Sequence, residues 1–263
     1  MSDDEVFVTF VAIVVGPMLW VGRLSQWRDL PRADGAVRVT AATLVICGAI
    51  LFGVLRTLAA TDVVHAPAYI FMYLMLGVAW LRVAETGFAF AGLSMRDEVA
   101  ERRNPAAMIA AAGAAIGVTL CYAGGNIGDG PGWWVVIVSA AIATALLFAC
   151  WLALGRFTDV TDAVTIDRDP AAGVRLAGFL IACGIVAGRA VAGDWESAML
   201  TVRDAASGVP ALLVMLIVAI AIERRARPTA ARPRAPMLAL GVLPALAYLA
   251  IASAAVERMG WPA

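Results

Sequence analysis

Long apolar runs, separated by short segments that hold most of the charge, constrain this chain more than any other feature. A helix needs about 20 apolar residues to cross a bilayer. Inside lipid the backbone N–H and C=O groups must pair within the protein, which favours helices. We therefore predict an all-α integral membrane protein with eight transmembrane helices. The apolar runs are 6–21, 39–60, 67–94, 105–122, 131–154, 170–192, 209–222 and 236–256.

Composition and charge agree with this class. Of the 263 residues, 62% are apolar and 15% are charged, whereas a soluble domain carries about 25% charged residues. Arginine gathers in the segments after the first, third, fifth and seventh runs, and basic residues mark the cytoplasmic side of a membrane protein. We therefore predict a multi-pass protein of the bacterial cytoplasmic (inner) membrane with both termini outside. The first of these segments holds Arg23, Arg28, Arg32 and Arg38, and the last holds Arg224, Arg225, Arg227, Arg232 and Arg234.

One short block of residues occurs three times, and each copy starts 65 residues after the previous one. A fixed period indicates that a structural unit has been duplicated. A unit of two helices keeps its orientation, so we expect parallel repeats within a single membrane domain. The repeat units lie at about 32–96, 97–161 and 162–228, with a partial unit at 229–263. The copies begin Arg38-Val39-Thr40-Ala41-Ala42, Arg103-Asn104-Pro105-Ala106-Ala107 and Arg168-Asp169-Pro170-Ala171-Ala172.

Small residues recur on one face of the helix that each copy starts. The first Ala and the downstream Gly are seven residues apart, which is two helical turns. Helices in lipid pack by close backbone approach over such residues. We interpret the stripe as helix packing and not as a ligand site. The predicted packing residues are Ala41, Gly48, Ala106, Gly113, Gly117, Ala171, Gly178, Gly184 and Gly188.

The second and third copies, with the Gly193-Asp194-Trp195 loop, resemble the bacterial membrane family called domain of unknown function 350. Asp97 and Asp162 look like the acidic residue that precedes the Asn-Ala-Ala stretch of that family. The resemblance covers 97–225 best, and the Asn is kept only at Asn104. It implies paired transmembrane helices, and it supplies no catalytic residues because the family has no established activity.

Three charged residues fall within or near the predicted spans, namely Arg82, Glu85 and Arg175. If the third run is one helix, Arg82 and Glu85 lie near mid-membrane, where an unpaired charge costs about 2.5 kcal/mol or more. If the span ends near residue 83, both lie at the inner surface. Arg175 either extends to the inner surface or joins Arg82 and Glu85 in a buried polar cluster that lines a solute path or anchors neighbouring helices. These alternatives stay open.

Further charged residues fall in or near the predicted outer segments. They form either a mouth for a charged solute or a solvated rim. The neighbouring Gly-rich loop 124–130 lacks the Lys and the Ser or Thr of a phosphate-binding loop, so we interpret it as a tight turn. The candidate mouth residues are Arg56, Asp62, His65, Asp129, Arg189, Asp194 and Glu196.

The sequence indicates no cofactor, no metal site and no enzymatic reaction. The four cysteines lack zinc spacing, and the single His has no partners for a catalytic set. We favour a small-solute or ion permease or channel; the alternative is a non-transporting membrane anchor or scaffold for a soluble cytoplasmic enzyme. Expected partners are the lipid bilayer, a second copy of the chain, or a soluble protein at the segment from Arg224 to Arg234. Nucleic acid is not expected.

Overall fold

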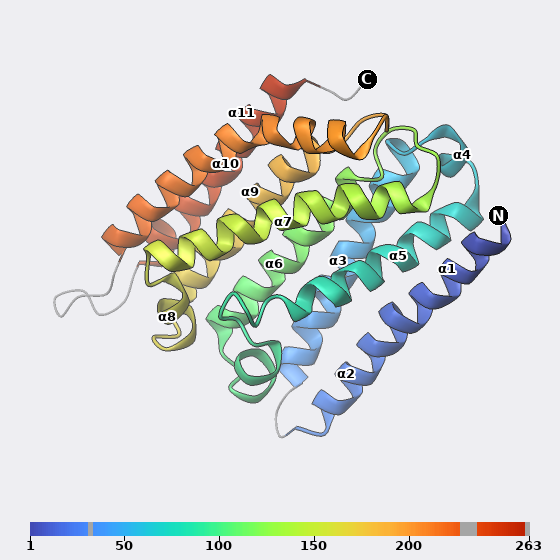
Figure 1. Ribbon diagram of the computed structural model, residues 1–263. Helices are drawn as coiled ribbons and strands as arrows, with labels where there is room; N and C mark the ends of the chain where they lie inside the picture. The colour runs from blue at the N-terminus through green and yellow to red at the C-terminus, as the bar shows by residue number, and fades with distance from the viewer. Residues whose placement is uncertain (31–33, 227–235, 261–263) are drawn as a thin grey trace.

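The computed structural model describes residues 1–30, 34–226 and 236–260. These residues contain eight helical spans long and apolar enough to cross a membrane, so the predicted architecture is confirmed. Figure 1 shows both chain termini at one end of the bundle, called here the terminal end, and α8 (Val160–Thr165) at the other, called the α8 end. The spans are α1 (Asp3–Ile13) continued by η1 (Val14–Met18) and α2 (Leu19–Arg28), α3 (Asp34–Thr57), α5 (Pro67–Thr86), α6 (Pro105–Gly124), α7 (Trp133–Phe157), α9 (Pro170–Ala190), α10 (Ala198–Ala226), and η3 (Leu238–Val242) continued by α11 (Leu243–Met259).

Three spans differ in length from the predicted runs. The first is longer, because α2 continues past the apolar run to Arg28; Pro17, inside the run, lies in the π-helical turn η1. The third is shorter, because α5 ends at Thr86 and turns follow, with Gly92 at a φ of +87°. The seventh begins at Ala198, well before the predicted residue 209. Short helices α4 (Thr61–Val64) and η2 (Met95–Glu101) lie between spans.

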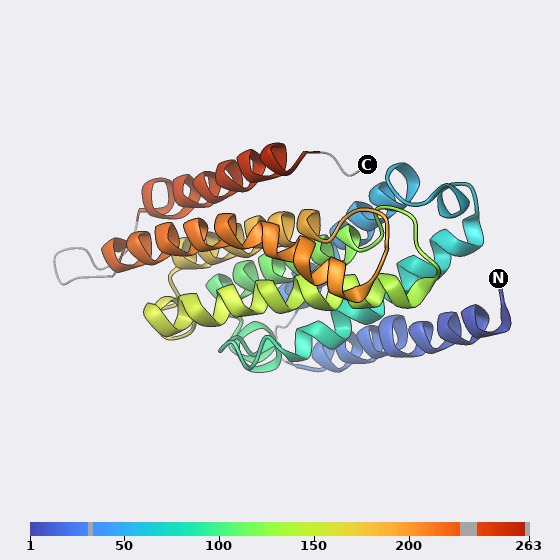
Figure 2. The same cartoon turned by 45° about the horizontal axis from the view of Figure 1, so that its top comes forward.

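Helices α6 and α9 form the centre of the bundle, and most residues of both are buried. Their backbones meet over glycines. A Cβ added at Gly184 would lie 2.4 Å from the carbonyl oxygen of Gly117, and one added at Gly124 would lie 2.1 Å from that of Gly188. Such close approach gives the dense van der Waals contact that holds helices together in lipid. Figure 2 shows α1 and α2 at one edge of the molecule and α11 at the other, with α6 and α9 between them.

The predicted packing residues do not all lie in this seam. Gly113 faces Ala177 on α9, Gly178 faces Ala245 on α11, and Ala106 and Ala171 are almost fully buried. Nothing lies within 4 Å of a Cβ added at Gly48, and Ala41 is only half-buried. The expectation of a small-residue seam is therefore corrected for α3. Its buried face is made of larger side chains, which keep neighbouring backbones apart: Val37, Thr40, Thr43, Cys47, Leu51 and Leu55.

The loops that lead into α6 and α9 share one backbone geometry. Arg103 and Arg168 both adopt the left-handed conformation, with φ of 51° and 53°. The following residues, Asn104 and Asp169, each accept a hydrogen bond from the backbone N–H two residues later, at 3.0 and 3.1 Å. A Pro then starts each helix at a position where its missing N–H costs nothing.

Candidate functional site: an acidic cavity at the terminal end

Two interhelical loops pair with each other at the terminal end. The N–H of Gly193 donates to the carbonyl oxygen of Ile127 at 3.0 Å, and the N–H of Trp195 donates to that of Asp129 at 2.8 Å. The carboxylate of Asp194 accepts the N–H of Asp129 at 2.8 Å. Gly128, at a φ of +100°, lets the loops approach closely, because a Cβ there would lie 2.3 Å from the backbone of Gly193.

These loops frame a cavity of about 160 Å³. Carboxylates line it from five separate parts of the chain, and no basic side chain is among the lining residues that the structure describes. Tyr69, Tyr73, Ser139 and Thr201 add hydroxyl groups. The cavity therefore presents acceptor oxygens and negative charge. Its acidic residues are Glu5, Asp62, Asp129, Asp194 and Asp204.

Asn126 contributes a buried amide to the wall of the cavity. The residue is 5% exposed, and its Nδ2 donates to the carbonyl oxygen of Tyr122 at 2.8 Å. Its Oδ1 is buried and has no hydrogen-bond partner among the described residues. An unsatisfied buried acceptor costs about 1–3 kcal/mol. This oxygen is consequently free to accept an N–H group or to contact a cation.

The structure places three of the seven predicted mouth residues, Asp62, Asp129 and Asp194, on the cavity wall. Arg56 instead donates to the carbonyl oxygen of Val64 at 3.0 Å, and Arg189 donates to that of Gly260 at 2.6 and 2.8 Å. The basic side chains are thus used to satisfy backbone carbonyls, which corrects the expected mouth of mixed charge. His65 and Glu196 also lie outside the lining.

Sequence reasoning missed three lining residues, Glu5, Asn126 and Asp204. A usable signal was present, because the predicted outer segments hold several acidic residues and few Arg. Sequence spacing does not show which of those acidic residues face a common space. That depends on how the loops at the terminal end pair.

The proposed intramembrane cluster of Arg82, Glu85 and Arg175 is not one cluster. Glu85 is 5% exposed and accepts hydrogen bonds from Arg23 and from Arg82, the latter at 2.8 Å. Since α5 ends at Thr86, this group lies in the last turn of the helix. No hydrogen bond or ion pair joins it to Arg175 among residues 1–30, 34–226 and 236–260.

Arg175 is 2% exposed and does not extend to the surface. Its Nε and Nη2 donate to the carboxylate of Glu223 at 2.6 and 2.9 Å, and its Nη1 donates to the carbonyl oxygen of Leu240. Glu223 lies in the last turns of α10, where the adjacent Arg224 and Arg225 suggested a solvated end. The sequence therefore offered no sign that Glu223 is buried.

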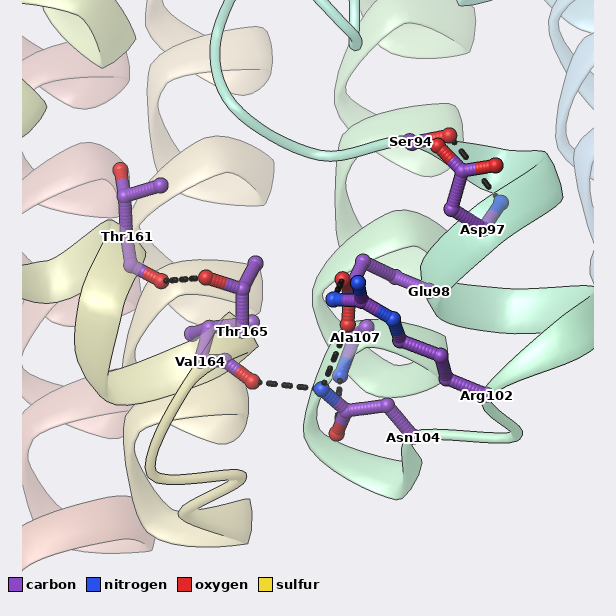
Figure 3. A network of polar contacts seen from close by, with 9 residues as sticks. All are labelled: Ser94, Asp97, Glu98, Arg102, Asn104, Ala107, Thr161, Val164 and Thr165. Atoms are coloured by element: carbon purple, nitrogen blue, oxygen red, sulfur yellow. Dashed lines mark hydrogen bonds and ion pairs between the residues drawn. The ribbon is translucent and has the colours of Figure 1, made fainter.

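Asn104 forms a second buried polar group at the α8 end, drawn in Figure 3. It is fully buried, and its Nδ2 donates to Glu98 at 3.1 Å and to the carbonyl oxygen of Val164 at 2.7 Å. Figure 3 shows the Asn104 side chain between its own loop and α8. Arg102 donates to the other oxygen of Glu98 at 2.5 Å. Each of these polar groups has a partner, so we interpret the network as structural. The hydrogen bonds that Asn104 donates to Glu98 and Val164 are called here the clasp.

Metal ligation has little support in the part of the chain that the structure describes. No group of three or more His, Cys, Asp or Glu side chains there converges as metal ligands. The carboxylates of the acidic cavity are therefore spread around its wall. Cys47, Cys121, Cys150 and Cys183 are free and buried.

The predicted family resemblance is confirmed for the C-terminal half of the chain. Residues 128–257 match the family described as Domain of Unknown Function (DUF350). The matched segment is called here the DUF350-like domain. It begins later and ends later than the stretch 97–225 where the resemblance was expected to be best. No curated protein and no solved structure matches the chain.

The acidic cavity is shared between the DUF350-like domain and the residues before it. The domain contains Asp129, Asp194 and Asp204, whereas Glu5, Asp62 and Asn126 precede it. The domain also contains both partners of the buried pair formed by Arg175 and Glu223. Of the predicted partner-binding arginines, Arg224 and Arg225 belong to the last turn of α10, whereas Arg227, Arg232 and Arg234 lie outside the described residues.

Proposed function

We propose that this multi-pass membrane protein is a permease for a small cation and that the acidic cavity is its outer entrance. The observation that carries the proposal is the lining of that cavity, which combines five carboxylates, a free buried amide oxygen and no basic side chain among the described residues. Charge of one sign in a recess with low-dielectric walls focuses the field and raises the local concentration of the opposite ion. The entrance therefore favours cations over anions.

The size of the cavity suits a small cation. A single water molecule needs about 10–15 Å³ of cavity volume, and this cavity offers about 160 Å³. A hydrated monovalent ion or a small organic ammonium ion fits this space. Both ions present a single positive charge surrounded by O–H or N–H donors.

A second cavity, of about 350 Å³, lies at the α8 end and supports the same proposal. Asp162, Asp167 and Glu223 are among its lining residues, together with Arg175. Tightly packed helices separate the two cavities, so transport requires a second conformation in which this packing opens. The arrangement matches a carrier more closely than an open channel.

Proteoliposome flux tests the proposal. Purified protein is reconstituted, and uptake of rubidium ion and of methylammonium is measured. We expect uptake above that of empty liposomes, and we expect Asp62→Asn with Asp204→Asn to lower it at least tenfold. Glu196→Gln is the matched control, because Glu196 is an acidic residue of the same end that does not line the cavity.

The outcome also separates the permease from the scaffold alternative. Absence of cation uptake by folded protein would overturn the permease, as would uptake that the double variant leaves unchanged. A soluble protein that copurifies in a fixed ratio from detergent, combined with absence of uptake, would favour the scaffold.

A further inference from the structure

Three charged side chains meet where α2 and α5 approach each other near the α8 end. Arg23 on α2 donates to one oxygen of Glu85, and Arg82 on α5 donates to the other oxygen at 2.8 Å. Two guanidinium groups and one carboxylate leave a net charge of +1 on the group. Both oxygens of Glu85 are already used, so the extra positive charge needs another anion.

The same group holds unused hydrogen-bond donors. A guanidinium carries five N–H groups, and the Nε of Arg82 is buried with no partner in the described part of the chain. The indole N–H of Trp20 is also buried without a partner in that part of the chain, and the residue is 4% exposed. The guanidinium carbon of Arg82 lies 5.9 Å from the centre of the Trp20 ring, and that of Arg23 lies 5.9 Å from Trp27. The rings orient the guanidinium planes through cation–π attraction.

The position of the group matches the level at which lipid head groups lie. Arg23 is in the second half of α2, and Glu85 is next to the last residue of α5. Figure 2 shows α1 and α2 at the edge of the bundle, where lipid surrounds a membrane protein. Val21 and Val83, which are near Arg23 and Arg82 in the sequence, are 67% and 55% exposed, so apolar side chains face outward at the same level of α2 and α5. A charged site next to exposed apolar side chains fits a ligand that is anionic at one end and apolar at the other.

We propose that Arg23 and Arg82 bind the phosphate of an anionic phospholipid whose acyl chains lie along Val21 and Val83. Guanidinium groups bind phosphate oxygens through paired, charge-assisted hydrogen bonds. Clusters of basic residues at the membrane surface favour anionic over zwitterionic lipids. The negative head group offsets the extra charge and supplies acceptors for the partly exposed guanidinium N–H groups that Glu85 does not use. This site is separate from the acidic cavity and does not depend on transport.

Native mass spectrometry of the full chain tests the site. Protein in detergent is mixed with equal amounts of phosphatidylglycerol and phosphatidylcholine, and the lipid retained per protein is counted. We expect the wild type to retain phosphatidylglycerol preferentially, and Arg23→Gln to retain at least fivefold less of it. Arg96→Gln is the matched control, because Arg96 lies near the same end, is 76% exposed and pairs with Glu101.

A second variant keeps the test decisive if Arg23 proves important for folding. Arg82→Gln leaves Glu85 paired with Arg23, so the buried carboxylate keeps a partner while the net charge of the group falls to zero, and we expect this variant also to lose phosphatidylglycerol. Thermal unfolding reports whether each variant is folded. Wild-type retention by both variants, equal retention of the two lipids, or displacement of phosphatidylglycerol by inorganic phosphate at equal concentration would overturn the proposal.

Discussion

Helices α3, α6 and α9 begin with copies of the same block of residues, yet only α6 and α9 meet backbone to backbone. In those two helices glycines face the carbonyl groups of the partner helix, as Gly184 faces Gly117. In α3, Gly48, which is the equivalent of Gly113 and Gly178, faces open space. Small residues thus permit close approach but do not cause it. The partner helix must present its own backbone at the same level.

The entry loops differ between the copies in the same way. Arg38 lies inside α3, which begins at Asp34, whereas Arg103 and Arg168 lie before their helices with positive φ. The second and third copies have a Pro two residues after the Arg, and Pro disfavours helix in the residue before it. The first copy has Thr40 at that position, so its helix begins earlier. One substitution within the block therefore changes where the helix starts.

The second and third copies also differ from each other in one side chain. Asn104 caps α6 with its oxygen and clasps Glu98 and Val164 with its amide nitrogen. Asp169 caps α9 in the same way, but its second oxygen is buried without a partner among the described residues. A carboxylate has no donor, so it can form the cap but not the clasp.

The largest effect is expected from Asn104→Asp. Asp and Asn cap helices about equally well, so the cap is retained while both donated hydrogen bonds are lost. The new carboxylate also faces Glu98. Each buried group left unsatisfied costs about 1–3 kcal/mol, and we expect a loss of about 3 kcal/mol in the free energy of unfolding, measured by denaturation in mixed micelles. Asp169→Asn is the control and is expected to change stability by less than about 1 kcal/mol; equal losses would mean that the clasp contributes nothing.

A smaller effect is expected from Gly184→Ala. The added Cβ would lie 2.4 Å from the carbonyl oxygen of Gly117, so α6 and α9 must separate. Overpacking of this kind costs about 1–3 kcal/mol, and we expect a loss of about 2 kcal/mol in the same assay. In Gly48→Ala the added Cβ lies in open space, and Ala is a better helix former than Gly. The free energy of unfolding should therefore stay the same or rise by up to about 1 kcal/mol. Similar losses at both positions would remove the distinction between α3 and the other two helices.

The smallest effects are expected when the Arg that begins each copy of the block is replaced with Gly. The sign of the effect is expected to differ between copies. Arg103→Gly relieves a left-handed residue, which costs about 1 kcal/mol for a residue with a Cβ, and should stabilise by up to about 1 kcal/mol. Arg38→Gly places Gly inside a helix and should destabilise by about 1 kcal/mol. Thermal unfolding of the two variants in parallel measures the sign, and a loss at Arg103 would show that its side chain matters more than its backbone.

The number and type of the spans could be read from the sequence, because each depends on one continuous stretch of apolar residues. Even so, the ends of α2, α5 and α10 were misplaced. The first helix continued past its apolar run, through Arg23, to Arg28. Polar residues in the first turns of α10 hid its start at Ala198. Helix ends depend on local hydrogen bonds that apolar content does not report.

The sequence by itself determined that this chain is an eight-span helical membrane protein with a duplicated block, because those properties follow from local composition and spacing. Only the tertiary structure decided which charges meet. Glu5, Asp62 and Asp204 share one cavity, and Arg175 pairs with Glu223 instead of Glu85. Each of these contacts joins residues from different helices. Their meeting depends on how the helices rotate and pack against one another, and no single stretch of sequence encodes that arrangement.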